Sequence, residues 1–350
     1  MIVHTNARRR DRAKIMAVTG KDIARELGIS QPTVSRILSG RGVDRISLET
    51  RERVMEAAAR LDYQPNAIAR SLRHGKTDVV GFYSVYDYDA RNDFLGALIG
   101  SLQRACNAYH LDLLLFSAFS ERARDEIASK LRDGRIDGLF LHAAPSDPLA
   151  GALARASLHV VALADALPGI PSVSFNNERG MRDLIAQLRA RGYEKFVFVA
   201  PDVDLESVER RRQAFETATN GLEARTVRVS YENSAPVLDE LRGWRGQKLA
   251  VCCWNDRTAY NLLEASAKLG WNVPGDLAIT GFDGFVSHKF PCRALVTVGG
   301  DWDELARSAL EMMTAQIGEQ AAPDSVVLPV RLIEGDTIQP RKADRTAQTS

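Results

Sequence analysis

The strongest constraint on the fold is a regular alternation that begins at Asp78. Continuous apolar runs of six to eight residues alternate with amphipathic segments of ten or more. Continuous rather than alternating apolar runs are typical of strands covered on both faces, and the alternation predicts right-handed βαβ units with parallel sheets. The runs are 78–85, 111–118, 137–143, 158–164, 195–200, 249–254 and 277–283, and helices are expected at 94–109, 178–192, 206–219 and 256–270. Roughly 260 residues of this pattern exceed one sheet, which favours two doubly wound lobes with a cleft between them.

The first 60 or so residues have a different pattern, with helical periodicity only. Thr19, Ser30 and Ser47 are placed to cap three short helices, and Gly28 is placed to end the first of them. In the third helix an apolar face is expected to include Leu48, along with Val54, Ala57, Ala58 and Leu61. The sequence therefore predicts one compact unit of three helices with a tight turn after the first.

The stretch GISQPTVSR, residues 28–36, suits the second helix of a helix-turn-helix, whose N-terminal residues reach base edges in the major groove. Pro32 falls in the first turn, where its missing N–H costs nothing. Gln31 can read one base edge and Arg36 can fork onto guanine, whereas Thr33 and Ser35 suit phosphate contacts. The alternative is a merely solvated helix face. The residues expected at DNA are Ser30, Gln31, Pro32, Thr33, Ser35 and Arg36.

The charge distribution supports an anionic partner for one end of the chain. The net charge of the 350 residues is only +1, yet residues 1–76 carry 16 Lys and Arg against 8 Asp and Glu, and the remainder has a net charge of −7. The N-terminus lacks a secretory signal and no run is long enough to span a membrane, so a cytoplasmic location without membrane contact is expected. The basic tract at 7–14 suits a disordered tail better than a DNA-tracking arm.

Four cysteines, Cys106, Cys252, Cys253 and Cys292, lack metal-ligand spacing and are expected to be reduced, with neither zinc nor a disulfide framework. The chain has no GxGxxG, P-loop, HExxH or GxSxG motif, so no cofactor, metal or catalytic residue is expected. These absences argue against an enzyme.

The segments 18–40, 49–77 and 273–285, which read VTGKDIARELGISQPTVSRILSG, ETRERVMEAAARLDYQPNAIARSLRHGKT and VPGDLAITGFDGF, resemble the LacI/GalR (lactose-repressor) family of bacterial transcription regulators. The resemblance runs from about residue 17 to 335. It implies an all-α helix-turn-helix headpiece joined to a two-lobed, periplasmic-binding-protein-like effector domain. It also implies base contacts by Gln31, Pro32 and Arg36, and a homodimer that reads a near-palindromic operator in double-stranded DNA.

Residues 63–77 match the family's hinge helix, which is ordered when two copies pack in the minor groove. The residue composition agrees, because small residues allow close approach and a helix this short is marginal alone. Leu72 would wedge between base steps. The alternative is a plain interdomain linker. The residues expected in this role are Asn66, Ala69, Arg70, Leu72 and Arg73.

Polar residues and one aromatic residue, in the segments that follow several expected strands, are candidates for a small-molecule site between the lobes. They are Tyr86, Asp93, Phe94, Arg211, Asn255 and Asp283. The resemblance assigns effector contacts to Arg211, Asn255 and Asp283 and ring packing to Phe94. Each of these residues could instead have a purely structural role, for example as a helix cap or as an arginine on the surface. These side chains suit a polyhydroxylated effector, because each buried hydroxyl group needs hydrogen-bond partners. The effector could either release the protein from DNA or promote its binding to DNA.

Three positions depart from the family pattern. Residues 91–93 read Arg-Asn-Asp before Phe94, 176–177 read Asn-Asn, and Gly284 replaces a common Asp. These departures predict a polar wall in the N-terminal lobe and leave a sugar, a sugar acid and a sugar phosphate open as effectors. Arg91 and Arg211 suggest an anion, and Asp93 argues against it.

The sequence favours a repressor whose operator affinity depends on an effector. The alternative is a solute-binding protein of a transporter, which shares the lobes but not the basic head. The expected domains are a basic tail at 1–16, a DNA-binding unit at 17–62, a hinge at 63–77, an effector-binding and dimerisation domain at 78–338 and a disordered tail at 339–350. The C-terminus lacks the leucine heptads of a coiled-coil tetramer.

Overall fold

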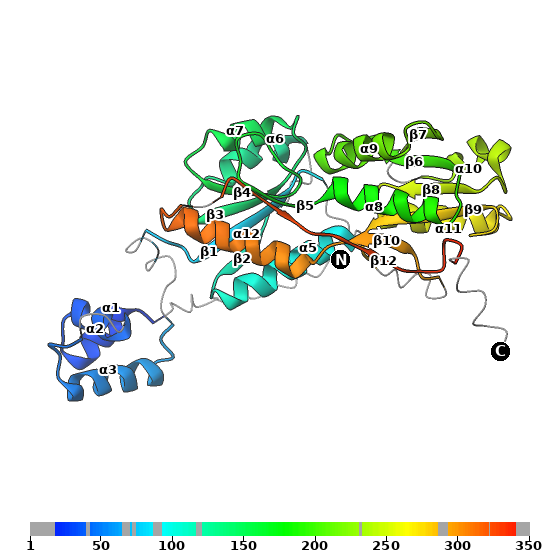
Figure 1. Cartoon of the computed structure of the whole chain (residues 1–350). Helices are drawn as coiled ribbons and strands as arrows, with labels where there is room; N and C mark the ends of the chain where they lie inside the picture. The colour runs from blue at the N-terminus through cyan, green and yellow to red at the C-terminus, as the bar shows by residue number, and fades with distance from the viewer. Residues whose placement is uncertain are drawn as a thin grey trace, which may run out of the picture. The chain divides into compact units, whose positions relative to one another are not determined.

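A computed structural model of the chain describes residues 18–39, 43–64, 71, 75–86, 93–116, 121–230, 233–285, 293–321 and 323–340. The chain divides into two compact units, Met1–Thr77 and Asp78–Ser350. Figure 1 labels the helices and strands of each unit. The residues expected to form the hinge, Asn66, Ala69, Arg70, Leu72 and Arg73, lie outside the described residues.

The first unit contains helices α1 (Gly20–Leu27), α2 (Gln31–Ser39) and α3 (Leu48–Arg60). Gly28 ends α1 in the left-handed conformation with φ 66°, which glycine adopts without steric cost. Ser30 Oγ accepts a hydrogen bond from Thr33 N at 3.2 Å, and Ser47 Oγ accepts one from Thr50 N at 3.3 Å. These two serines cap α2 and α3 as the sequence predicted.

The core of the first unit consists of one buried face from each helix. Ile23, Val34 and Val54 are fully buried at its centre. The expectation that Leu48 belongs to this face was wrong, because Leu48 is the first residue of α3 and its side chain is 72% exposed. The half-buried Arg51 guanidinium donates to Ile46 O at 2.9 Å and to Val43 O, so this arginine holds the loop before α3.

The N-terminal lobe of the second unit is a six-stranded parallel sheet in the order β11-β5-β4-β3-β1-β2. Helices α5 and α12 pack on one face, and α6 and α7 on the other. The strands are β1 (Val79–Ser84), β2 (Asp112–Leu115), β3 (Gly138–His142), β4 (His159–Ala164), β5 (Ser172–Phe175) and β11 (Ser325–Leu328). The helices are α5 (Asp93–Ala108), α6 (Glu121–Lys130), α7 (Pro148–Ala154) and α12 (Trp302–Ile317).

The C-terminal lobe is a second six-stranded sheet in the order β12-β10-β9-β8-β6-β7. Helices α8 and α9 cover one face, and α10 and α11 the other. The strands are β6 (Lys195–Pro201), β7 (Glu223–Val229), β8 (Leu249–Cys253), β9 (Leu277–Asp283), β10 (Val296–Gly299) and β12 (Arg331–Ile333). The helices are α8 (Asn177–Ala190), α9 (Glu206–Ala218), α10 (Pro236–Glu240), the short η1 (Arg242–Trp244) and α11 (Asp256–Lys268).

The chain passes between the lobes at three places: after β5, between β10 and α12, and between β11 and β12. These crossings return α12 and β11 to the N-terminal lobe, so the lobes are not two contiguous halves of the sequence. All seven expected strands are present, and the predicted fold class is confirmed. One detail was wrong, because β12 pairs with β10 in antiparallel orientation at the edge of an otherwise parallel sheet.

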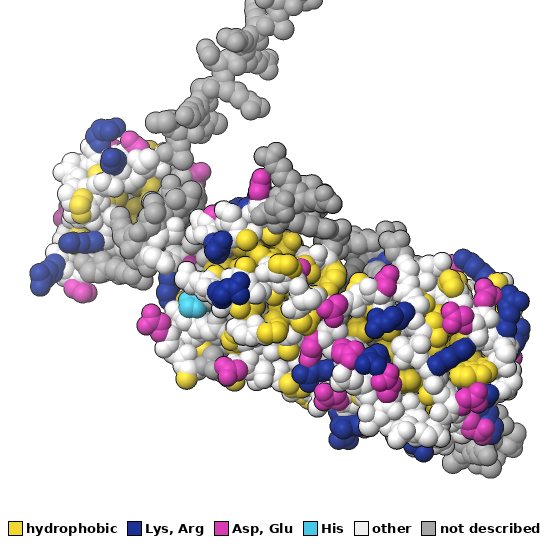
Figure 2. Space-filling model, turned by 90° about the horizontal axis from the view of Figure 1, so that it is seen from above, with side chains coloured by type: hydrophobic (Ala, Val, Ile, Leu, Met, Phe, Trp, Pro, Cys, Tyr) yellow, Lys and Arg dark blue, Asp and Glu magenta, His cyan; other side chains and the backbone are white. Residues whose placement is uncertain are grey.

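The surface of the C-terminal lobe is densely charged. Figure 2 shows basic and acidic side chains side by side on this lobe. On α9, Arg212 pairs with Glu209 at 2.6 Å and with Glu216 at 2.5 Å. Interspersed exposed ion pairs keep a surface soluble and contribute little stability. Within the described part of the chain, no helix is long and apolar enough to cross a membrane.

Candidate functional site

Helix α2 presents an exposed polar face opposite its buried one. Val34 and Ile37 face the core, whereas the side chains of Gln31, Pro32 and Arg36 are exposed. Thr33 and Ser35 are half-buried on the same helix, and the Thr33 hydroxyl lies 2.8 Å from Ser30 Oγ. The proposed reading residues therefore share the solvent side of a helix whose other side is fixed by packing.

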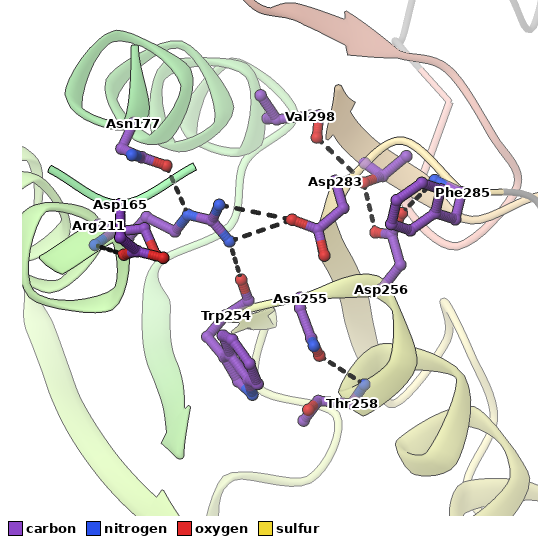
Figure 3. A network of polar contacts seen from close by, with 12 residues as sticks. Asp165, Asn177, Arg211, Trp254, Asn255, Asp256, Thr258, Asp283, Phe285 and Val298 are labelled. Atoms are coloured by element: carbon purple, nitrogen blue, oxygen red, sulfur yellow. Dashed lines mark hydrogen bonds and ion pairs between the residues drawn. The ribbon is translucent and has the colours of Figure 1, made fainter. Parts of the chain in front are cut away.

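In the second unit, a buried arginine joins three segments of the C-terminal lobe (Figure 3). Arg211 lies on α9 and is only 6% exposed. Its Nε donates to Asn177 Oδ1 at 2.8 Å, its Nη1 donates to the backbone carbonyl of Trp254, and both terminal nitrogens lie 3.4 Å from Asp283 Oδ1. The guanidinium also lies over the Phe282 ring, 3.7 Å from its centroid. Arg211 is therefore no surface arginine.

Asp283 ends β9 in an unusual backbone conformation. Its φ is 125°, a region that residues with a side chain rarely adopt, and Gly284 follows with φ 82°. Its Oδ1 accepts from Arg211, and no described residue donates to its Oδ2. Backbone strain of this kind is concentrated at functional sites, where the surrounding structure holds it in place.

Burial has the largest effect on the pKa values of Asp283 and its charged neighbours. Burial raises the pKa of Asp283, and the neighbouring Asp256 and Asp165 raise it further, although Arg211 opposes them. Burial also raises the pKa of Asp256, against hydrogen bonds from Thr297 and the Phe285 backbone. Burial lowers the pKa of Arg211, opposed by the same three carboxylates. The network thus sets one guanidinium among three carboxylates.

Asn255 is the N-cap of α11, and its Oδ1 accepts from Thr258 N at 2.8 Å. Asn255 therefore does cap a helix, but the cap uses only the Oδ1 atom of its amide group. The Asn255 residue is 5% exposed, and its NH₂ group has no acceptor among the described residues. Asn255 lies next to Trp254, the residue whose carbonyl accepts from Arg211.

The strand ends of the N-terminal lobe contribute a second polar group that sequence reasoning missed. Asp165 follows β4 and is 2% exposed, and its Oδ2 lies 3.4 Å from His142 Nε2 at the end of β3. Ser84 Oγ, at the end of β1, lies 3.1 Å from His142 Nδ1. Burial favours a raised pKa for Asp165, but hydrogen bonds from His142 and Ser207 hold its pKa below the ordinary value.

Hydrogen bonds join this group to the C-terminal lobe at the start of α9. Ser207 N donates to Asp165 Oδ1 at 2.7 Å, and Ser146 Oγ donates to Asp204 Oδ2 at 2.6 Å. Tyr86 OH donates to the Asp204 carbonyl at 3.4 Å. Asp165 and Ser207 are both buried, so their bond is shielded from solvent, whereas the two bonds to Asp204 are exposed. We call the residues on both sides of this junction, Tyr86, Phe94, His142, Asp165, Arg211, Asn255 and Asp283, the interlobe site.

Aromatic rings line the N-terminal side of the interlobe site. Phe94 lies on α5, with its centroid 4.9 Å from the His142 ring and 5.3 Å from the Trp302 ring. Phe175 also meets Trp302, at 4.9 Å. The described wall therefore combines aromatic rings with the polar group around His142. Arg91 and Asn92 lie outside the described residues, and Asp93 is exposed at the start of α5.

A separate cavity of about 560 Å³ lies at the crossings between the lobes. Its wall includes Trp302 and Phe285, and the rest comes from α5, the segment from the end of β10 into α12, and the segment from the end of β11 into β12. Cys106, Cys252 and Cys253 are buried elsewhere as free thiols, and Cys292 lies outside the described residues. Within the described residues, no group of three or more His, Cys, Asp or Glu side chains could hold a metal ion.

Together these features define a helix-turn-helix unit joined to a two-lobed domain of the periplasmic-binding type, with polar groups where the lobes meet. Residues 19–66 match the model of bacterial regulatory proteins of the lacI family, and residues 185–338 match the periplasmic binding protein-like domain. The chain belongs to the LacI family of bacterial regulatory proteins.

Full-length relatives support this assignment. The chain is 24% identical to the transcriptional regulator KdgR of Bacillus subtilis, over 90% of this chain and 96% of that protein. It is 25% identical to catabolite control protein A of Priestia megaterium, over 91% and 98%. It is 24% identical to the transcriptional repressor PurR of Vibrio vulnificus, over 92% and 98%. The predicted family is confirmed, and these relatives are transcriptional regulators rather than enzymes.

Solved structures share the fold over nearly the whole chain. The Lac repressor dimer bound to operator and the anti-inducer ONPF superimposes with a TM-score of 0.79 and 22% identity, covering 93% of this chain and all of that one. The complex of the regulator CelR with cellobiose superimposes with a TM-score of 0.65 and 22% identity, covering 91% and 99%.

Proposed function

We propose that this DNA-binding transcriptional regulator is a cytoplasmic homodimeric repressor that binds a near-palindromic operator and releases or retains it according to a small effector in the interlobe site. The observation that carries the proposal is the contact of Arg211, on helix α9, with Asp283 at the end of β9, with Asn255 following β8. This group adjoins the junction at which Asp165 of the other lobe accepts from Ser207 N at the start of α9. Lobes joined this way close or open when a ligand binds between them.

On the DNA side, the capped and packed helix α2 supplies the major-groove contacts. Gln31 and Arg36 would read base edges, Pro32 would meet a thymine methyl, and Ser30, Thr33 and Ser35 would contact phosphates. Asn66, Ala69, Arg70, Leu72 and Arg73 would form the paired hinge in the minor groove, with Leu72 as the wedge that bends the duplex.

The N-terminal lobe offers an edge suited to the second copy. Strand β2 is the sheet edge, and its last residue, Leu115, is 48% exposed. Tyr109, after α5, is 41% exposed beside the same strand. Exposed apolar residues at a sheet edge favour association, and a symmetric dimer would cover them.

The effector that best fits the interlobe site is an uncharged polyhydroxylated molecule such as a neutral sugar. Asp283 Oδ2 can accept a hydrogen bond and the Asn255 amide can donate one, and a hydroxyl group both donates and accepts. The Phe94 ring, which lies against His142, offers apolar surface to a sugar ring. An acid or phosphate would instead meet three carboxylates with a single guanidinium, already occupied by Asn177, Trp254 and Asp283.

A thermal-shift screen tests this effector class. Each sugar in the panel is compared with its uronic acid and its phosphate, because ligand binding to the folded state raises the melting temperature by mass action. We expect shifts with one or more neutral sugars and none with the matched anions. Asp283→Ala serves as the site control, and an equal shift in that variant would place the ligand elsewhere.

Operator binding is tested by selection from a random duplex pool. Enriched sequences should contain an inverted repeat, and affinity for them should fall steeply with salt because several phosphates are neutralised per dimer. Enrichment of sequences without an inverted repeat would contradict binding as a symmetric dimer. An affinity that does not change with salt would contradict binding through neutralised phosphates.

A further inference from the structure

We propose that Trp302, together with helix α12 that it begins, couples the interlobe site to the start of β1, where the chain arrives from the DNA-binding unit. The inference rests on the proposed function, because it explains how occupancy between the lobes reaches the operator. It assigns to Trp302 a positioning role and no contact with DNA.

The first step is the polar end of the indole. Trp302 Nε1 donates to the backbone carbonyl of Asp283 at 3.1 Å. Asp283 is the residue whose side chain faces Arg211 and whose backbone has φ 125°. A change in the Arg211–Asp283 contact therefore acts on the Asp283 peptide, and the indole N–H follows that peptide.

The second step is the position of the ring. In the N-terminal lobe its edge contacts are Phe94 at 5.3 Å and Phe175 at 4.9 Å. It also stacks with Phe285, which directly follows the C-terminal strand β9 and Gly284, at 5.4 Å and an interplanar angle of 21°. Trp302 thus packs between rings of both lobes, and a change in lobe angle must move it relative to one set of partners.

The third step is helix α12, whose first residue is Trp302. Helix α12 runs along the N-terminal lobe and packs on α5, β4, β5 and β3 (Figure 1). Its fully buried Met313 occupies the space that a side chain at Gly138 would need. From Trp302 to Met313 the helix rises about 16 Å, at roughly 1.5 Å per residue.

The fourth step links Gly138 to the arriving chain. Gly138 pairs with Val80 in the β1–β3 ladder. One residue earlier, Asp137 N donates to Val79 O at 2.7 Å, and Asp137 Oδ2 accepts from Asp78 N at 2.9 Å. Met313, near the C-terminal end of α12, therefore packs against the β1–β3 strand pair. This pair holds residues 78–80, the first residues of the second unit.

The cavity at the crossings provides the free volume that motion requires. Close-packed interiors resist rearrangement of a large ring, but the cavity of about 560 Å³ borders both Trp302 and Phe285. The indole therefore has adjoining space into which it can shift when the angle between the lobes changes.

Linkage provides a test without knowledge of the effector. If the interlobe site changes operator affinity, operator binding must change the interlobe site by the same free energy. Hydrogen exchange of peptides covering 204–211 and 281–285 is measured for the full chain, with and without the duplex enriched from the random pool. We expect the duplex to change exchange at these peptides by at least about fivefold, within the usual range of such couplings.

The test variant is Trp302→Phe, which removes the N–H and keeps an aromatic ring. The matched control is Trp271→Phe, because Trp271 is buried in the C-terminal core among Leu277, Val273 and their neighbours and has no part in the proposed coupling. Trp302→Phe should bind the duplex within about threefold of the native chain and lose most of the duplex-dependent change. Trp271→Phe should keep that change, as a merely structural tryptophan would.

If Trp302→Phe does not fold, Met313→Leu alters the other end of α12 at nearly constant volume and should weaken the same response. A full duplex-dependent change in the folded Trp302 variant, or none in the native chain, would overturn the inference. Failure to enrich any duplex would overturn the proposed DNA binding and the inference with it.

Discussion

Gly284 and Gly299 approach so closely that a Cβ added to Gly284 would lie 2.9 Å from the Gly299 Cα. Gly284 also has φ 82°, which favours glycine. Many members of the LacI/GalR family have aspartate here, so the local packing explains this departure. The close pair joins the ends of β9 and β10 directly beside Asp283.

The first prediction is that Gly284→Asp destabilises the chain by about 1 to 3 kcal/mol, from left-handed backbone strain and overpacking. The control is Gly221→Asp, since Gly221 has φ 78° but nothing within 4 Å of its added Cβ. Urea denaturation should show a larger loss at Gly284 than at Gly221. Equal losses would show that backbone conformation alone fixes the glycine.

A second prediction concerns pH. Because burial raises the folded-state pKa of Asp283 above its unfolded value of 3.8, the folded chain retains a proton that the unfolded chain releases. This contribution to the free energy of unfolding is therefore largest in acid and is lost as pH rises from about 4 through the folded-state pKa. Asp283→Asn removes that dependence.

Unfolding free energies of the native chain and Asp283→Asn are measured from pH 5 to 7. The native value should fall relative to the variant by at most about 1.4 kcal/mol per pH unit, the limit for one proton. The variant has no titrating group at this position, so its own profile should be the flatter of the two. Parallel pH profiles would mean that Arg211 keeps Asp283 ionised throughout.

The lobes and most of their elements could be predicted from the sequence, because doubly covered strands have long apolar runs that stand out from their surroundings. Short edge and crossing elements could not. Strands β11 and β12, for example, are only four and three residues long, and only one of their residues is buried, so they lack the long apolar run of a strand covered on both faces. Leu48 was misplaced because an apolar residue at a helix start need not share the face of later turns.

The interlobe site was predicted only in part. Arg211, Asn255 and Asp283 follow recognisable strands or match the family pattern, and the structure brings them together. His142 and Asp165 were missed, because each is a single polar residue at the end of an apolar run. Their relation depends on β3 and β4 being neighbours in the sheet, which no local spacing encodes.

A third prediction tests base reading by Arg36. Arg36→Ala should weaken binding to the selected duplex by about 1 to 3 kcal/mol and relax preference at one base pair of each half-site. Arg53→Ala removes an equally exposed charge from α3 and should weaken binding without changing base preference. Equal losses on selected and random duplexes for Arg36→Ala would indicate a phosphate contact instead.

The last prediction concerns the buried hydrogen bond across the lobes. Asp165→Ala leaves two buried groups, Ser207 N and His142 Nε2, without their acceptor. Each group left unpaired should lower the free energy of unfolding by about 1 to 3 kcal/mol. Ser146→Ala also removes an interlobe hydrogen bond, but this bond is exposed, and its loss should lower the free energy of unfolding by well under about 1 kcal/mol.

Urea denaturation compares the stabilities of the two variants, and small-angle scattering compares their radii of gyration. Asp165→Ala should expand the second unit by opening its lobes, and an unchanged radius with a small stability loss would show that other contacts hold the lobes together.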